Sequence, residues 1–339
     1  MCGNRLQPAM DSIRIESIVR FVFSVDDVIR TRFAISPMFE LTRSLLALRN
    51  PSYASLHVPW LRTLSGRMQG IELERAAVLL PERGFTPDFL TPPPPGPLGS
   101  IEEDLAALRA TPTAQIRSDM RLFAKQHAKV SDLVDRWMAY PRREVGRLAD
   151  QLEAYWERGL EPVWPRVRAF LDADITHRAR RQADGGPAAL FADLADGVRW
   201  ADRSLSVTTP RHEATIDLAG RGLVLMPSAF AAVRPVVIDR APWQPTLIYP
   251  ARGIATLWED ASPAPDGLVR LLGATRAAVL TDLAAPRSTT EVSERQAISP
   301  AGASHHLAAL RDAGLLTACR AGRSVLYVRT ALGDALVAA

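Results

Sequence analysis

Four short segments decide the fold of the C-terminal part of this 339-residue chain: Ser288-Thr-Thr-Glu291, Ser299-Pro-Ala-Gly-Ala-Ser-His-His-Leu-Ala-Ala-Leu310, Ala313-Gly-Leu-Leu316 and Gly322-Arg-Ser-Val-Leu-Tyr327. Ser288 and Glu291 have the spacing of a capping box, which predicts a helix that begins at Thr289 and ends near Ala297. Ser299 is placed to cap a second helix, whose first residue is a proline that needs no hydrogen-bond partner there. Two start signals so close together indicate two short helices joined by a tight turn.

The second of these helices has two different faces. At about 100° per residue, its apolar face holds Ala303, Leu307 and Leu310. The opposite face holds small or polar residues, namely Ala301, Ser304, His305 and Ala308. A helix that lies in the DNA major groove needs short side chains, so that its backbone can approach, and a few hydrogen-bonding groups for the base edges. The pattern therefore predicts a DNA-reading helix.

A hairpin is expected after this helix. Gly314 is placed to end the helix, because the residue just past a helix end is often left-handed. The runs 315–320 and 324–330 are then separated by a short Ala-Gly-Arg turn. Arg320 and Arg323 lie at or near the tip of this hairpin, where they suit contact with phosphates or with the minor groove. Two helices followed by such a hairpin are the layout of a winged helix-turn-helix domain.

Residues 268–336 resemble the ArsR-type winged-helix regulators of bacteria. The strings that carry the resemblance are Ser304-His-His-Leu307, Leu310-Arg-Asp-Ala-Gly-Leu-Leu316 and Gly322-Arg-Ser-Val-Leu-Tyr327. The resemblance implies a homodimer that binds a palindromic operator in double-stranded DNA, with Ser304 and His305 at the base edges. The candidate DNA-binding residues are Ser299, Ala301, Gly302, Ser304, His305, Arg320 and Arg323.

Two departures from those regulators matter. Members that sense metals often carry a cysteine pair in the first helix of the motif, and here that helix reads Thr289-Thr-Glu-Val-Ser-Glu-Arg-Gln296. We therefore expect no metal and no other cofactor. Relatives place longer polar groups where this chain has Pro300, Ala301 and Gly302, so Ala301 is limited to touching a thymine methyl group. DNA shape is then expected to carry more of the specificity.

Composition limits the remaining classes of function. The net charge is +4 and there are two cysteines, Cys2 and Cys319, which indicates neither a nonspecific nucleic-acid coat nor a disulfide framework. No apolar run reaches the length of about 18 residues that a membrane span needs, and the first residues lack the apolar core of a signal peptide. We expect a cytoplasmic, nucleoid-associated protein whose residues 1–12 form a disordered tail.

The long region before the winged helix is expected to be α+β. Capping signals at Ser36 and Ser100 predict helices, and residues 142–183 read as a long amphipathic helical region broken near two prolines. The segments Val198–Trp200, Leu205–Thr208, Ala214–Leu218, Leu223–Met226, Val236–Asp239 and Thr246–Tyr249 read as an antiparallel meander. The proline-rich run 91–97 reads as a rigid spacer, and the cluster Arg178, Arg180 and Arg181 as a solvated helix end rather than a site for an acidic partner.

This N-terminal region also resembles, more loosely, an uncharacterised domain that precedes winged helices in regulators of high-GC bacteria. The strings are Thr31-Arg-Phe-Ala-Ile-Ser-Pro37, Pro87-Asp-Phe-Leu-Thr-Pro-Pro93, Leu152-Glu-Ala-Tyr-Trp-Glu157 and Trp243-Gln-Pro-Thr-Leu-Ile-Tyr-Pro250. The predicted organisation is thus an N-terminal α+β region over 13–259, a linker over 260–267 and a winged helix-turn-helix domain over 268–339.

These observations favour a one-component transcription regulator that is not an enzyme. We expect a repressor that acts as a homodimer, with the helices of residues 142–183 supplying much of the interface, and that responds to a small organic effector held among N-terminal aromatic side chains. Two alternatives stay open. The winged helix could serve contact between proteins, although two arginines on the hairpin disfavour this. An enzyme with a regulatory C-terminal domain would need a catalytic group formed only in three dimensions.

Overall fold

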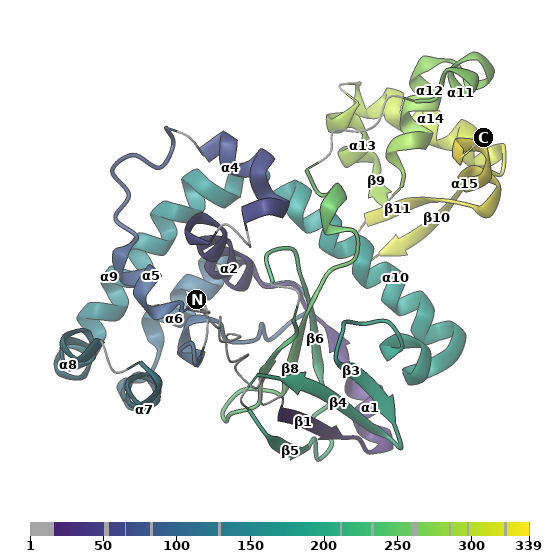
Figure 1. The fold of residues 1–339 in the computed structure, drawn as a ribbon. Coiled ribbons are helices and arrows are strands. Elements are labelled where there is room, and N and C mark those ends of the chain that lie inside the picture. Colours follow the sequence, from purple (N-terminus) through teal and green to yellow (C-terminus); the bar gives the residue numbers. More distant parts are fainter. Residues whose placement is uncertain are drawn as a thin grey trace, which may run out of the picture.

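The computed structural model describes residues 17–50, 54–64, 66–81, 84–127, 130–210, 212–231, 234–258, 264–284, 286–296, 298–321 and 324–338. The described chain has three parts, which are a helical lobe, a pair of small sheets and a C-terminal winged helix (Figure 1). The predicted α+β class, with a winged helix-turn-helix domain at the C-terminal end, is confirmed. The predicted tail over residues 1–12 lies outside the described residues, and so does the first half of the predicted linker, residues 260–263.

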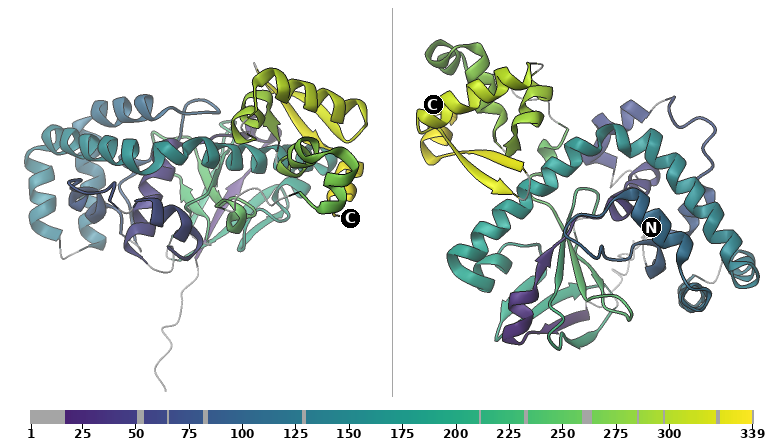
Figure 2. Two further views of the ribbon diagram at one scale, coloured as in Figure 1. Left: turned by 90° about the horizontal axis from the view of Figure 1, so that it is seen from above. Right: turned by 180° about the vertical axis from the view of Figure 1, so that it is seen from behind.

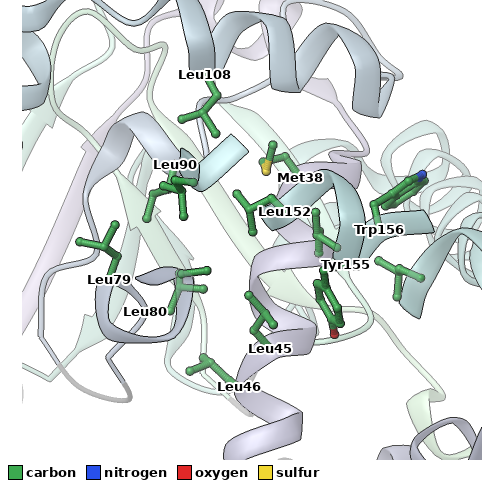
Figure 3. Close-up of a cluster of buried hydrophobic side chains, with 14 of the residues drawn as sticks. Met38, Leu45, Leu46, Leu79, Leu80, Leu90, Leu108, Leu152, Tyr155 and Trp156 are labelled. Carbon is green, nitrogen blue, oxygen red and sulfur yellow. The ribbon is translucent and has the colours of Figure 1, made fainter. Parts of the chain in front are cut away.

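The helical lobe is built around one apolar core. Its helices are α2 (Pro37–Arg49), α4 (Val58–Leu64), α5 (Glu74–Leu79), α6 (Ile101–Ala110), α7 (Thr113–Gln126), α8 (Ser131–Ala139) and α9 (Pro141–Tyr155), with short 3-10 turns at Ser55–His57 and Asp88–Leu90. As predicted, Ser36 and Ser100 cap α2 and α6 by accepting a hydrogen bond from the backbone N–H of the third residue of each helix. Figure 3 shows leucines from α2, α5, α6 and α9 meeting in this core beside Tyr155.

One long helix connects this lobe to the rest of the molecule. After α9 the chain passes through a π-helical turn (Trp156–Leu160) and a 3-10 turn (Glu161–Val163), and then enters α10 (Trp164–Phe191). The break comes where the prolines predicted it, and a second kink lies at Gly185 and Gly186, whose backbone angles are not helical. In Figures 1 and 2, α10 runs between the sheets and the winged helix.

The two sheets are mixed, which corrects the predicted antiparallel meander. One sheet has the order β3-β4-β1-β5 and the other β2-β6-β8-β7. The strands are β1 (Ser17–Val22), β2 (Arg32–Phe33), β3 (Val198–Ala201), β4 (Ser204–Thr209), β5 (Ala214–Asp217), β6 (Val224–Ser228), β7 (Val236–Ile238) and β8 (Thr246–Pro250). The N-terminal strand β1 inserts between β4 and β5, so that Phe21 lies opposite both Leu205 and Ile216. Strands β2, β6 and β8 are parallel, and α1 (Val25–Arg30) connects β1 to β2.

The proline-rich run is also different from its prediction, because it does not act as a spacer. Ile35 donates its backbone N–H to the Pro97 carbonyl, and the Arg32 guanidinium donates to the carbonyls of Pro94 and Gly96. Pro94 is buried. Proline lacks a backbone N–H but keeps its carbonyl group as a hydrogen-bond acceptor. Here the carbonyls of the run accept hydrogen bonds from Arg32 and Ile35, which hold the run against β2.

The C-terminal domain has its own core. Its elements are α11 (Asp266–Leu272), α12 (Ala274–Asp282), β9 (Arg287–Ser288), α13 (Thr289–Arg295), α14 (Pro300–Asp312), β10 (Leu316–Ala321), β11 (Ser324–Arg329) and α15 (Ala331–Ala338). Strands β10 and β11 form the predicted hairpin, and β9 adds a third strand on the β11 side. Leucine, valine and alanine side chains from α11, α12, α13, α14 and the start of β10 fill the core between the helices and this sheet.

Candidate DNA-reading site

The two helices of the motif begin where the sequence predicts them. The Ser288 hydroxyl accepts the Glu291 backbone N–H at 3.3 Å, and the Glu291 carboxylate accepts the Ser288 backbone N–H at 2.7 Å. The Ser299 hydroxyl accepts the Gly302 backbone N–H at 3.1 Å and so caps α14. Both starts are set by contacts within four residues. Because it caps α14, the Ser299 hydroxyl already has a partner within the protein.

Helix α14 presents the two faces expected from its sequence. Ala303, Leu307 and Leu310 are buried in the core of the domain. The side chains of Ala301, Ser304 and His305 are exposed, while Gly302 and Ala308 are half-buried. Near the start of α14 the exposed face therefore carries only small side chains. The first hydrogen-bonding side chains on this face are those of Ser304 and His305.

The adjacent histidines have different environments. The rings of His305 and His306 lie 5.7 Å apart with an edge-on geometry. His306 is half-buried, and its pKa is lowered by burial and by the nearby His305 and Arg276. Because His306 is half-buried, His305 is the imidazole of this pair that faces solvent.

An ion-pair cluster that the sequence analysis missed orients the first helix. Asp282, at the end of α12, is almost fully buried and receives two nitrogens of Arg295, with contacts of 2.8 to 3.1 Å. Arg287 donates to the Asp282 carbonyl at 3.0 Å. The turn into α14 is closed by the Ser293 hydroxyl, which donates to the Ile298 carbonyl at 2.7 Å. These contacts join residues 5 to 13 positions apart and carry no periodic signal.

The hairpin is the least described part of the site. Gly314 has a φ of 72° and ends α14 as predicted, and the register pairs Ala321 with Ser324 across the turn. Arg320 lies on β10, but the structure describes only its backbone, and Arg323 lies outside the described residues. The DNA contacts expected of these two arginines therefore stay predictions, as do those of the α14 residues.

Three tryptophans of the N-terminal region, Trp60, Trp137 and Trp156, are buried in the core of the helical lobe. Trp60 and Trp137 are each 1% exposed. A cavity beside Phe23 and Phe191 has a volume of only about 10 Å³, which suits a single water molecule. Within the described residues, no group of three or more His, Cys, Asp or Glu side chains is arranged to hold a metal ion, and no helix is long and apolar enough to cross a membrane.

Comparison with known proteins agrees with the site and leaves the N-terminal region open. Residues 271–318 match a family model described as a helix-turn-helix domain, and residues 110–255 match a family of unknown function (DUF5937). No curated protein and no solved structure matches the chain. The first match covers α12 to α14 and part of β10, which are the elements that build the exposed face of α14. The chain therefore carries a helix-turn-helix DNA-binding domain of the kind found in transcription regulators.

Proposed function

We propose that this protein is a one-component repressor that binds a palindromic operator as a homodimer and releases it in response to a small organic effector. The observation that carries the proposal is the exposed face of α14, where small side chains are followed by Ser304 and His305. Short side chains let the helix backbone approach the floor of the major groove. The subtype implied by the sequence resemblance, an ArsR-type regulator of the cytoplasm, belongs to this proposal.

The test of DNA reading is a binding titration with the upstream region of the protein's own gene. His305→Ala should weaken binding to the preferred site by about 1 to 3 kcal/mol and bind unrelated duplexes as before. His212→Ala removes another exposed histidine, on the loop before β5, and should leave both affinities unchanged. Binding by neither the wild type nor the control, even at low salt, would favour the alternative of a protein-contact domain.

The homodimer is proposed because one reading helix covers only a few base pairs. The apolar side chains of α9 do not supply its interface, since Val145, Leu148 and Leu152 are each at most 1% exposed within their own chain. A contact through the helices of residues 142–183 would use their polar outer face instead. Light scattering should give the mass of two chains plus one duplex when DNA is present, and a monomer under all conditions would remove this part of the proposal.

The effector part of the proposal rests on the aromatic cluster at the end of the N-terminal region, just before the linker. Trp258 precedes the undescribed residues 259–263, and its indole N–H donates to His57 Nδ1 at 3.0 Å. The Trp60 and Phe230 rings complete this aromatic cluster. A ligand that opens the cluster would change the last described contacts before the reading domain. Every tryptophan precedes residue 259, so an effector should alter tryptophan emission and operator affinity over one concentration range.

A further inference from the structure

Two turns of α10 and the loop after β8 gather three arginines and a histidine around two aspartates. Arg178 is fully buried, and its guanidinium donates to the Asp193 carboxylate at 2.5 Å and to the Asp193 carbonyl at 2.9 Å. Asp174 accepts the Tyr249 hydroxyl at 2.8 Å and the Arg252 backbone N–H at 3.1 Å. This corrects the prediction of a solvated helix end, because α10 continues to Phe191 and Arg178 has no contact with solvent.

Both aspartates of this cluster are already engaged, and two arginines are left over. Neither the Arg181 guanidinium nor the Arg252 guanidinium makes a hydrogen bond or ion pair with any described residue, although Arg181 is only half-exposed. Arg181 Nε and His177 Nε2 are both buried without a partner. A buried nitrogen without a partner is costly, and such groups are usually satisfied by a water molecule or an ion. The cluster therefore contains buried hydrogen-bond donors for which the described residues supply no acceptor.

The pKa values of Asp193 and His177 are shifted in the direction that an excess of nearby positive charge produces. Burial pushes the pKa of Asp193 upward, yet the pKa is lowered overall because Arg178, Arg181 and Arg252 stabilise the carboxylate. The pKa of His177 is lowered by burial and then by Arg252 and Arg178, which outweigh the two aspartates. An added anion would relieve both of these effects.

The cluster also lies close to the reading domain. On α10, Arg166 acts electrostatically on Arg287 of β9, and Asp172 is affected by Glu291 of α13. His177 follows Asp172 by less than two helical turns. In Figures 1 and 2 the hairpin strands β10 and β11 run toward α10. The first half of α10 therefore lies beside β9 and α13 of the reading domain, and the arginine cluster follows on the next turns of the same helix.

We propose that Arg181, Arg252 and His177 form a binding site for a phosphate group. Guanidinium groups present paired N–H donors that match phosphate oxygens, and an imidazole adds a third donor once it is protonated. The phosphate comes either from the backbone of DNA bound by the winged helix, which rests on the function proposed above, or from a small phosphorylated ligand.

The first experiment uses inorganic phosphate as the probe, with ionic strength held constant by chloride. Phosphate should bind the full-length wild type in calorimetry and shift the His177 ring signal in histidine-labelled NMR spectra. The double change Arg181→Ala and Arg252→Ala should weaken this binding at least about tenfold, because it removes both free guanidinium groups. The matched control is Arg121→Ala with Arg142→Ala, which removes the same charge from exposed positions on α7 and α9 and should bind phosphate like the wild type.

The second experiment separates the two sources of phosphate by measuring DNA affinity against salt. If the site holds the DNA backbone, the double variant should bind all duplexes more weakly, and its slope of log affinity against log salt should fall by about 1 to 2. If the site holds a small ligand, the double variant should lose phosphate binding and keep the DNA affinity of the wild type. Phosphate binding without any DNA binding by the wild type would refute the proposed function and support the site.

The proposal is overturned if the double variant matches the control in both experiments. Circular dichroism and thermal melting establish that each variant is folded. Should the double variant unfold, Arg252→Glu provides the same test, because Arg252 is exposed and its side chain has no described partner. This reversal of charge should abolish phosphate binding, and phosphate affinity equal to that of the wild type would overturn the proposal.

Discussion

Glu40 is a buried carboxylic acid that makes the stability of the N-terminal region depend on pH. It lies on α2 with 1% of its surface exposed, and its Oε2 accepts the backbone N–H groups of Ala229 at 2.9 Å and Phe230 at 3.2 Å. Burial raises its pKa from 4.5 to about 7, and hydrogen bonds from Ser228, Ala229 and Phe230 limit that rise. The contact ties α2 to the segment after β6, where Phe230 joins the aromatic cluster around Trp258.

Replacing Glu40 with glutamine should remove this pH dependence. The folded protein holds the Glu40 proton more tightly than the unfolded chain, so the carboxyl group costs stability as pH rises from 4.5 to about 7, and above that the cost is constant. At about 1.4 kcal/mol for each pKa unit, the full cost is about 3 kcal/mol. Between pH 5 and pH 8, the unfolding free energy of the wild type should fall relative to that of Glu40→Gln by about 2 to 3 kcal/mol.

The assay is urea unfolding followed by tryptophan fluorescence at several pH values. Asp88 and Asp104 also have raised pKa values, about 7 and about 6, because of burial. They contribute equally to wild type and variant, so the difference between the two isolates Glu40. Glu72→Gln alters an exposed side chain before α5 and serves as the control for loss of one carboxylate. A constant difference between wild type and Glu40→Gln across this range would show that Glu40 does not titrate as argued.

Three changes test the contacts of the reading domain, and a fourth, in α9, is a matched control; all four are measured by thermal or urea unfolding. Ser288→Ala removes the cap of α13 and should cost about 1 kcal/mol; no loss would show that the cap is dispensable. Asp282→Asn leaves its two arginine partners short of a buried acceptor and should cost about 1 to 3 kcal/mol, whereas an unchanged midpoint would contradict the cluster's role. Gly333→Ala should destabilise α15, because the new Cβ would lie 2.3 Å from the Leu315 carbonyl oxygen. The same change at Gly146 of α9 meets nothing within 4 Å and should stabilise by about 0.5 to 1 kcal/mol; equal effects at the two glycines would refute this reasoning.

The sequence predicted the reading domain well because its signals are local. Ser288 and Ser299 satisfy backbone groups three residues away, so the helix starts can be read from neighbouring letters. The same holds for Gly314, whose left-handed conformation ends α14. The buried and exposed faces of α14 follow from its period alone. The Asp282 cluster could not be found in this way, because its partners come from separate elements.

The sequence located the strands of the N-terminal region but did not predict how they pair. Alternating apolar residues show which side chains face a core, and they hold no information on which strand lies next to which. The wrong meander came from pairing strands in chain order, whereas β1 comes from about 180 residues earlier and separates β4 from β5. Arg178 was misplaced for a related reason. Its burial depends on Asp193 and Tyr249, which are supplied by a loop and by β8.

Helix α10 is the element through which the N-terminal region can act on DNA reading. Its first half contributes Val167 and Leu171 to the core of the helical lobe, and its last turn contributes Leu190 and Phe191 to the core beneath the first sheet. In the first turn of α10, Arg166 donates to the Leu257 carbonyl next to Trp258 and acts electrostatically on Arg287 of β9. A ligand that moves either lobe must shift α10 or strain both cores, because packed interiors deform little. A phosphate bound at Arg181 and Arg252 would act on a later part of the same helix, so the effector and the anion would both influence DNA binding through α10.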